Sequence, residues 1–149
     1  MYKHILIPTD GSERSERAVA HGCALAAALD AKVTVLTVTT PLHSIATDPK
    51  PIADILGSDS FVHEYLYGPA DNILAVAENI AADNGMICQT IRLEHEHAYV
   101  AIIETAKAKR CDLIVMASHG RRGIAALILG SETMKVLTHG TIAVLVHRS

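Results

Sequence analysis

A glycine-rich stretch with hydroxyl and basic side chains runs from Ala117 to Thr133, in the order Ala-Ser-His-Gly-Arg-Arg-Gly-Ile-Ala-Ala-Leu-Ile-Leu-Gly-Ser-Glu-Thr. It follows the apolar segment Leu113–Met116 and leads into a helical pattern that begins near Ser131. A strand that ends in a glycine loop and re-enters a helix presents backbone N–H groups and the positive end of a helix dipole, which favour bound phosphate. The stretch therefore indicates a nucleotide, although glycines also occur in strand-to-helix turns that bind nothing, and Ser131 could serve only as an N-cap.

Three widespread nucleotide or hydrolase motifs are missing from the chain. A Walker A loop needs Gly-Lys before its Ser or Thr, but leucine and glycine precede Ser131. The dinucleotide fingerprint needs Gly-x-Gly-x-x-Gly after the first strand, where only Gly11 occurs. A nucleophile elbow needs glycine where Met116 stands, so Ser118 is a poor hydrolase nucleophile. The glycine stretch has to be interpreted from its surroundings instead.

Histidine side chains suggest two further kinds of chemistry, general-base catalysis and metal binding. His119 carries an imidazole, a side chain that often serves as a general base, but no orienting partner is evident, so packing or hydrogen bonding beside a ligand is favoured over that role. The run Glu94-His95-Glu96-His97 has the donor types of a transition-metal site. However, two histidines in a His-x-His pattern share one face only within a strand, and this run lies at a strand-to-helix junction. A solvated helix entry is favoured, and we predict no metal site.

The composition indicates one domain over residues 1–149. Half of the 149 residues are hydrophobic but only 3% are aromatic, so the core must consist of small aliphatic side chains packed between helices and a sheet. A chain of this length fits a single domain. The formal net charge is −3, and the basic residues are scattered apart from Arg121-Arg122, which argues against nucleic acid as a partner.

The sequence also argues against a membrane and for the cytosol. No apolar run approaches the roughly 18 residues needed to span a bilayer. A Pro-Thr-Asp sequence follows after only three apolar residues near the start, too few for a signal peptide. Cys23, Cys88 and Cys111 lie far apart in apolar segments, which is typical of buried reduced thiols rather than of a disulfide framework.

Alternating apolar and helical patterns divide the chain into strands and helices. They predict strands at residues 3–8, 32–39, 86–93, 112–116 and 141–146, and helices at residues 13–29, 70–85, 99–109 and 131–138. Ser12 can cap the first helix, and Gly85 is well placed to end the second. From Thr40 to Pro69 the pattern breaks down, with room for a short helix within residues 52–66. Five strands joined by helical crossovers predict an α/β fold, a doubly wound, Rossmann-like five-stranded parallel sheet with helices on both faces.

Ligands of such sheets lie outside the carboxyl ends of the strands, where the strand order reverses. Pro8-Thr9-Asp10 ends the first predicted strand, and the residues from Met116 to Gly120 end the fourth. If these two strands are neighbours, both loops face one site, and the end of the second strand forms its side.

The combined motifs resemble those of the universal stress proteins along almost the whole chain. The shared features are Pro-Thr-Asp-Gly-Ser in the first loop, the apolar Asp-Leu-Ile-Val-Met strand, Ser-His-Gly, nine residues, Gly-Ser and a closing Val-Leu strand. The nucleotide-binding branch of that family has the pattern Gly-x-x-Gly-x9-Gly-Ser/Thr, which matches Gly120, Gly130 and Ser131. Ala117 replaces the first glycine, where a β-carbon can limit close approach of a ligand. The resemblance implies an adenine nucleotide alpha-hydrolase-like fold and adenine nucleotide binding.

The resemblance also implies a role for each matching position. It places Pro8, Thr9, Asp10, Val38, Met116 and Ala117 around the adenosine, and Gly120, Gly130, Ser131, Glu132 and Thr133 around the phosphates. Asp10 would accept hydrogen bonds from the ribose or adenine region, and the backbone of Val38 would meet the base. Glu132 would have to turn outward or help to hold a divalent cation, which leaves Mg²⁺ with the phosphates open. Arg121 and Arg122 would either neutralise phosphate oxygens or lie as solvated loop charges.

The implied function is a regulatory or stress-response module that binds ATP or AMP, with slow or no hydrolysis. Two alternatives stay open. One is a nucleotide-free dimeric interaction module. The other is an adenylating or nucleotide-hydrolysing enzyme of the related superfamily, whose Ser-Gly-Gly-x-Asp-Ser signature is only partly present in the Thr-Asp-Gly-Ser of the first loop.

The last predicted strand is too apolar for a bare sheet edge, which would invite uncontrolled pairing. In the family this strand commonly forms a homodimer contact. We therefore expect a symmetric dimer through Ile142, Val144 and Val146.

Overall fold

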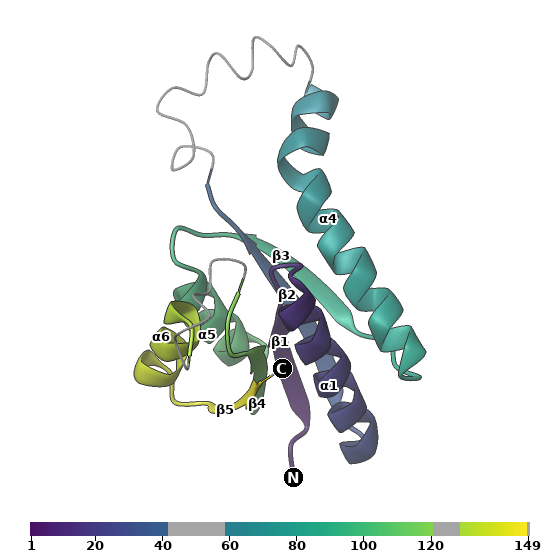
Figure 1. Cartoon of the computed structure of the whole chain (residues 1–149), viewed down its shortest axis with the longest axis vertical. Helices are drawn as coiled ribbons and strands as arrows, with labels where there is room; N and C mark the ends of the chain where they lie inside the picture. The colour runs from purple at the N-terminus through teal and green to yellow at the C-terminus, as the bar shows by residue number, and fades with distance from the viewer. Residues whose placement is uncertain (42–58, 121–128, 149) are drawn as a thin grey trace.

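The computed structural model describes residues 1–41, 59–120 and 129–148, and in them five parallel strands form one sheet (Figure 1). The strands are β1 (His4–Pro8), β2 (Lys32–Thr39), β3 (Gln89–Glu94), β4 (Leu113–Ala117) and β5 (Ala143–His147). Their order in the sheet is β3-β2-β1-β4-β5. The chain therefore fills one side of the central β1 with β2 and β3, and then crosses to the other side with β4 and β5.

Helices cover both faces of this sheet (Figure 1). They are α1 (Glu13–Leu29), α4 (Asp59–Asp83), α5 (Ala98–Ala108) and α6 (Ser131–His139). Side chains alternate along β1, so Ile5 and Ile7 pack with α1 and α4, while Leu6 packs with α5 and α6. All three side chains are fully buried. The doubly wound fold predicted from the sequence is confirmed. No helix of the described ranges is long and apolar enough to cross a membrane.

Three of the helices end with one residue in the left-handed conformation. Asp30 after α1 has φ 55°, Gly85 after α4 has φ 71°, and Arg110 after α5 has φ 56°. In each case the N–H of the following residue donates to the helix carbonyl five residues earlier, at 2.8 to 2.9 Å. This bond is typical of a helix C-cap. The predicted role of Gly85 is confirmed, and Met86 belongs to the turn rather than to the strand, which begins at Gln89.

Helix α4 begins at Asp59, whereas the sequence predicted a start at Ala70. Pro69 lies inside the helix. A proline lacks an N–H donor and crowds the carbonyl four residues earlier, which is why it was expected as a boundary. Packing outweighs this local cost, because the helix contacts α1, β2 and β3 and Ala70, Leu74, Ala77 and Ala81, which follow the proline, are buried. The short helix considered within residues 52–66 overlaps the start of α4, and its part before Asp59 lies outside the described residues.

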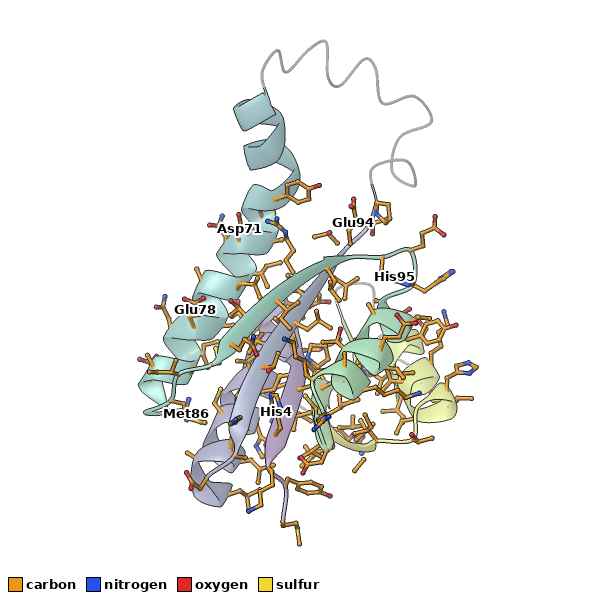
Figure 2. All side chains as sticks on the ribbon, turned by 180° about the vertical axis from the view of Figure 1, so that it is seen from behind. His4, Asp71, Glu78, Met86, Glu94 and His95 are labelled. Carbon is orange, nitrogen blue, oxygen red and sulfur yellow. The ribbon has the colours of Figure 1, made fainter. Side chains whose placement is uncertain are left out.

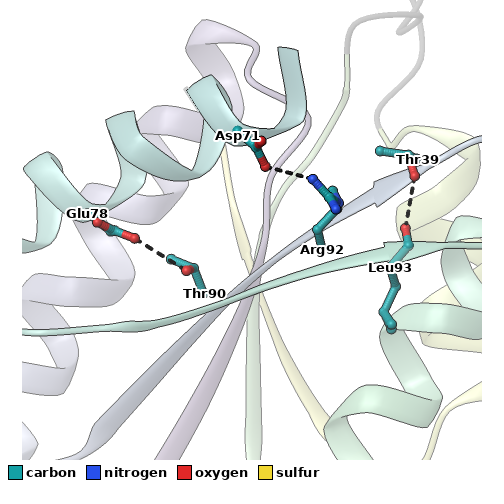
Figure 3. A network of polar contacts seen from close by, with 6 residues as sticks. All are labelled: Thr39, Asp71, Glu78, Thr90, Arg92 and Leu93. Atoms are coloured by element: carbon teal, nitrogen blue, oxygen red, sulfur yellow. Dashed lines mark hydrogen bonds and ion pairs between the residues drawn. The ribbon is translucent and has the colours of Figure 1, made fainter. Parts of the chain in front are cut away.

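Polar contacts fasten α4 to the edge strand β3 (Figure 3). Arg92 Nη1 lies 2.8 Å from Asp71 Oδ1, and Thr90 Oγ1 donates to Glu78 Oε1 at 3.3 Å. The Arg92 guanidinium also lies 4.3 Å from the centre of the Tyr67 ring. Exposed ion pairs contribute little singly, but the combination holds the outer edge of the sheet against α4 beyond the apolar core.

We expect Arg110→Gly to stabilise the protein by about 0.5 to 1 kcal/mol, because glycine occupies the left-handed region without the steric cost of a β-carbon. Arg110 is exposed, so its side chain buries little. Urea unfolding followed by circular dichroism measures the free energy of unfolding. Arg110→Ala is the matched control, since it removes the same side chain but keeps the β-carbon. Equal stability of the two variants would show that a β-carbon at position 110 has no steric cost.

Candidate functional site

The carboxyl ends of the strands lie along one edge of the sheet, and the candidate residues gather there. Figure 2 labels Glu94 and His95 at this edge, with His4 and Met86 at the opposite one. β1 and β4 are hydrogen-bonded neighbours at the centre of the sheet. The condition for a shared site, that the first and fourth strands are adjacent, is therefore met at the point where the strand order reverses.

The loops after β1 and β4 meet at Asp10 and Gly120. A β-carbon on Gly120 would lie 2.5 Å from Asp10 Oδ2, so a larger residue would have to displace the carboxylate. The carboxylate is also held on its own side, because Oδ1 accepts hydrogen bonds from the Ser12 N–H and the Ser15 hydroxyl, both at 2.9 Å. Asp10 is thereby fixed between the start of α1 and the loop after β4.

Hydroxyl groups of the first loop stabilise the loop itself. Ser12 Oγ accepts a hydrogen bond from the Ser15 N–H at 3.2 Å and caps α1. Thr9 Oγ1 lies 2.9 Å from Ser15 Oγ and accepts from the Gly11 N–H at 3.2 Å. Thr9 is only 6% exposed. Its hydroxyl therefore shapes the loop from within, while Ser12 provides an acceptor for one N–H at the N-terminus of α1.

Val38 turns its backbone toward the space beyond the end of β1. In a parallel ladder, residues two apart along a strand direct their N–H and C=O groups to the same neighbour. The Leu36 carbonyl accepts from the Thr9 N–H at 2.9 Å, so Leu36 faces β1. Val38 faces the same way, but the register of β1 with β2 ends at Pro8 opposite Leu36. The N–H and C=O of Val38 are thus directed to the site, where a planar base can bond to both.

The start of α6 is tied directly to the end of β4. The Gly130 N–H donates to the Ser118 carbonyl at 2.6 Å, and Thr133 Oγ1 donates to the Ala117 carbonyl at 2.9 Å. A β-carbon on Gly130 would lie 3.1 Å from Ser118 O and 3.3 Å from His119 Cα. Thr133 is 2% exposed, so its hydroxyl is directed to the strand and away from the surface.

Within the described part of the chain, the N-terminus of α6 has no side-chain cap, in contrast to that of α1. Gly130 occupies the N-cap position and offers no side chain. The first N–H groups of a helix have no acceptor within it. The first backbone bond of α6 runs from the Met134 N–H to the Gly130 carbonyl at 3.0 Å, which leaves the N–H groups of Ser131, Glu132 and Thr133 outside the helical pattern. Ser131 is exposed at this end. The geometry suits an anion.

Glu132 turns away from this end of α6 and bonds to α5. Its Oε2 accepts a hydrogen bond from the Tyr99 N–H at 2.9 Å, and its Oε1 lies 3.7 Å from Lys135 Nζ. His97, the N-cap residue of α5, makes no side-chain cap bond, so Glu132 supplies the acceptor that α5 lacks. Of the two orientations that the sequence left open for Glu132, the structure has the outward one.

The other expected site residues differ in accessibility. Met116 and Ala117 are 6% and 8% exposed at the end of β4, and Pro8 is half-buried at the end of β1. His119 Nδ1 lies 3.1 Å from Ser118 Oγ. Arg121 and Arg122 lie outside the described residues.

His147, at the end of β5, is a neighbour of the site that was not expected from the sequence. It lies opposite Ala117, and its carbonyl accepts from the Ser118 N–H at 3.0 Å. Its ring packs against His21 of α1 with centroids 4.9 Å apart, and its Nδ1 is buried with no hydrogen-bond partner among the described residues. Burial lowers the pKa of His147, and the charges of His21 and Arg17 lower this pKa further. Because His21 and His147 lie far apart in the sequence, no local motif predicts their contact.

The histidine run after β3 does not form a metal site in the described part of the chain. His95 Nδ1 accepts a hydrogen bond from the His97 N–H at 2.8 Å, and the two rings are 6.2 Å apart. No group of three or more histidine, cysteine or acidic side chains suited to a metal ion occurs among the described residues.

The three cysteines are free, and two of them, Cys23 and Cys111, are buried, while Cys88 is partly buried. Burial raises the pKa of Cys23 and of Cys111 to about 11, with smaller increases from Cys88 and from Asp112 respectively. The thiolate is the reactive form of cysteine. Cys23 and Cys111 are therefore core residues rather than nucleophiles.

Comparisons with known proteins identify one family. The family model described as the universal stress protein family matches residues 1–148. Universal stress protein MJ0531 of Methanocaldococcus jannaschii is 32% identical over 148 residues, which cover 98% of this chain and 82% of that protein. The solved structure of protein MJ0577 from the same organism has a TM-score of 0.79 at 28% identity and covers 100% of this chain and 97% of its own. A universal stress protein solved in complex with cAMP has a TM-score of 0.72 at 25% identity, with 99% of this chain and 97% of that chain covered.

We expect Thr133→Val to destabilise the protein by about 1 to 3 kcal/mol, because it leaves the buried Ala117 carbonyl without its hydroxyl donor. Thr133→Ser keeps the hydroxyl and should lose less. Thermal and urea unfolding of the three proteins measure the difference. A Thr133→Val variant as stable as the original protein would show that the hydroxyl bond to Ala117 does not contribute to stability.

We expect the free energy of unfolding to fall as the pH drops below about 6.5, in part through His147. Its pKa in the folded protein lies below the ordinary value of 6.5, so the unfolded chain takes up the proton first and gains stability. The loss begins near the unfolded pKa and stops growing below the folded one. His147→Phe keeps an aromatic ring against His21 and should show a smaller loss between pH 7.5 and pH 5 in urea titrations. An identical loss in both proteins would assign the pH dependence to other groups.

Proposed function

The chain belongs to the universal stress protein family, and from this premise we propose that it binds an adenine nucleotide at the carboxyl edge of its sheet. One observation carries the proposal. The two loops with the family's motif residues touch at Asp10 and Gly120, beside the uncapped first turn of α6. A relative that covers this chain almost completely was solved with cAMP, which supports a ligand of the adenine nucleotide class.

The proposed ligand extends from β2 to α6. The base lies at the open backbone of Val38, which can donate one hydrogen bond and accept another. The ribose lies between the loops, where Asp10 Oδ2 faces Gly120 and a carboxylate can accept from sugar hydroxyls. The phosphate end lies at the first turn of α6, where the helix dipole and the N–H groups outside the helical bonding pattern attract negative charge.

We propose a regulatory role in the stress response, with hydrolysis slow or absent. A general base must have a lone pair within reach of the attacking water. The carboxylates at the two motif positions are already engaged, Asp10 Oδ1 by the first loop and Glu132 Oε2 by the Tyr99 N–H. The protein would therefore signal through a partner that distinguishes its nucleotide-bound from its nucleotide-free form, rather than through turnover of the nucleotide. The proposal includes the cytosolic location expected from the sequence.

We further propose a symmetric homodimer through β5. The His147 carbonyl bonds to β4, so the backbone groups of alternate residues, Val144 and Val146, point away from β4 to the outer edge of the sheet. A second copy of β5 can pair with these groups. The side chains of Ile142 and Val144 pack against the α5 and α6 face, so the contact would be made mainly by backbone.

We expect freshly purified protein to release an adenine nucleotide on heat denaturation, detected by mass spectrometry, and calorimetric titration to show one saturable site per chain. Gly120→Ala should weaken binding at least about tenfold, because the new β-carbon would displace the Asp10 carboxylate from its bonds to Ser12 and Ser15. If no nucleotide is released and none binds, the nucleotide-free interaction module becomes the better account.

Ala117→Gly is the matched control, because it removes a β-carbon at the end of β4, whereas Gly120→Ala adds one in the loop that follows. It restores the family's first glycine and should keep or strengthen binding. Circular dichroism and size-exclusion chromatography verify that each variant is folded. Weaker binding in Ala117→Gly would contradict the position assigned to this residue.

A further inference from the structure

The peptide unit between Ala117 and Ser118 joins the end of β5 to the start of α6. Its N–H, that of Ser118, donates to the His147 carbonyl at 3.0 Å, and its carbonyl, that of Ala117, accepts from Thr133 Oγ1 at 2.9 Å. The Gly130 N–H also donates to the Ser118 carbonyl at 2.6 Å. A displacement of His147 is therefore passed through these hydrogen bonds to the first turn of α6.

The ring of His147 packs against α1. The ring centroids of His147 and His21 are 4.9 Å apart, and the two planes are inclined by 42°. In the described residues, the charged groups of α1 that act on this ring are His21 and Arg17, and Arg17 is itself paired with Glu13. The neighbouring strand β4 consists of apolar residues, and Arg148 follows His147 in the chain. The surroundings of the ring are thus apolar or positive.

These surroundings accept the neutral form of His147 and oppose the charged form. Nδ1 is buried and has no hydrogen-bond partner among the described residues. In a neutral imidazole one nitrogen carries no hydrogen, so Nδ1 can stay buried with the proton on Nε2, whereas in the imidazolium both nitrogens are donors. Protonation would place a charged N–H without an acceptor near Arg17, which costs free energy. The ring must therefore leave its place beside His21 when it takes up a proton.

We propose that His147 makes the nucleotide site sensitive to pH. Its protonation displaces the end of β5, the displacement loosens the first turn of α6 through the Ala117–Ser118 peptide, and nucleotide affinity falls in acid. The inference rests on the proposed function, because it assigns a regulation to that same site. Neutral His147 corresponds to the binding-competent form, so bound nucleotide opposes protonation of His147 by the same factor.

An NMR titration of the nucleotide-free full chain with pH tests the displacement in the absence of a ligand. We expect the His147 ring and the amide groups of Ser118 and Gly130 to share one midpoint below pH 6.5, because the pKa of His147 is lowered from that value by burial and by nearby positive charge. In His147→Phe the two amide signals should no longer follow pH in this range. Amide signals that do not follow the ring, or that still titrate in His147→Phe, would overturn the inference whether or not the protein binds a nucleotide.

Calorimetric titration with AMP and with ATP at pH 7.5 and pH 5 tests the effect on the site. We expect the affinity of the original protein to fall about five- to tenfold more than that of His147→Phe. The nucleotide phosphate titrates equally in both experiments, so the comparison removes its contribution. His139→Phe is the matched control, because His139 also packs against an aromatic ring, that of Tyr99, and this variant should behave as the original protein.

The outcomes separate the regulation from the proposed function. An equal loss of affinity in the original protein and in His147→Phe would overturn the inference and leave the proposed function intact. No binding at either pH would overturn the proposed function and with it the regulation of the site.

His21→Phe tests the ring pair with a shift in the opposite direction. It keeps an aromatic ring against His147 but removes a group whose positive charge lowers the pKa of His147. The midpoint shared by the His147 ring and the Ser118 amide should therefore move to higher pH. A midpoint that stays the same or moves lower in the folded variant would contradict the role assigned to the pair.

Discussion

The parallel pairing of β1 with β4 at the centre of the sheet is the constraint on which the site depends. β1 is apolar and its Ile5, Leu6 and Ile7 are fully buried, so it can occupy only the middle of a sheet that is covered on both faces. The chain leaves β1 toward α1 on one face and leaves β4 toward the other face, where α6 packs. Adjacent strands whose connections diverge leave an open position between their ends, and there Asp10 and Gly120 meet.

The second requirement is that the first turn of α6 is held in a fixed position next to the end of β4. Two bonds to the carbonyls of Ala117 and Ser118 fasten the first turn of α6 to the strand, and Glu132 fastens it to α5. The helix dipole is thereby aimed before any ligand arrives, and a preorganised group costs little ordering on binding. At α1 the Ser12 side chain caps one N–H of the first turn, whereas Gly130 offers no such acceptor at α6, so the start of α6 is better suited to an anion than the start of α1.

The fold could be predicted from the sequence because its signals are local. Apolar runs, Ser12 before α1 and Gly85 after α4 each act within a few residues, and these predictions were confirmed. Pro69 gave the wrong boundary because packing against distant elements outweighs the missing donor. The contact of the first and fourth loops could be predicted only as a condition on strand order, since periodicity does not specify which strands are neighbours. The partners of Glu132 and Thr133 could not be predicted, because their acceptor or donor lies 33 and 16 residues away.

The three motif positions have different structural reasons, and this explains why one of them tolerates alanine. Gly120 is required by the Asp10 carboxylate, and Gly130 by the backbone of Ser118 and His119. Ala117 lies within β4, where side chains alternate between the two faces. Val115, two residues earlier, belongs to the core on the α1 face, so the methyl group of Ala117 is directed to that face and away from α6. A β-carbon at this position therefore leaves the first turn of α6 unobstructed, whereas one at either glycine would disturb the contacts that form the site.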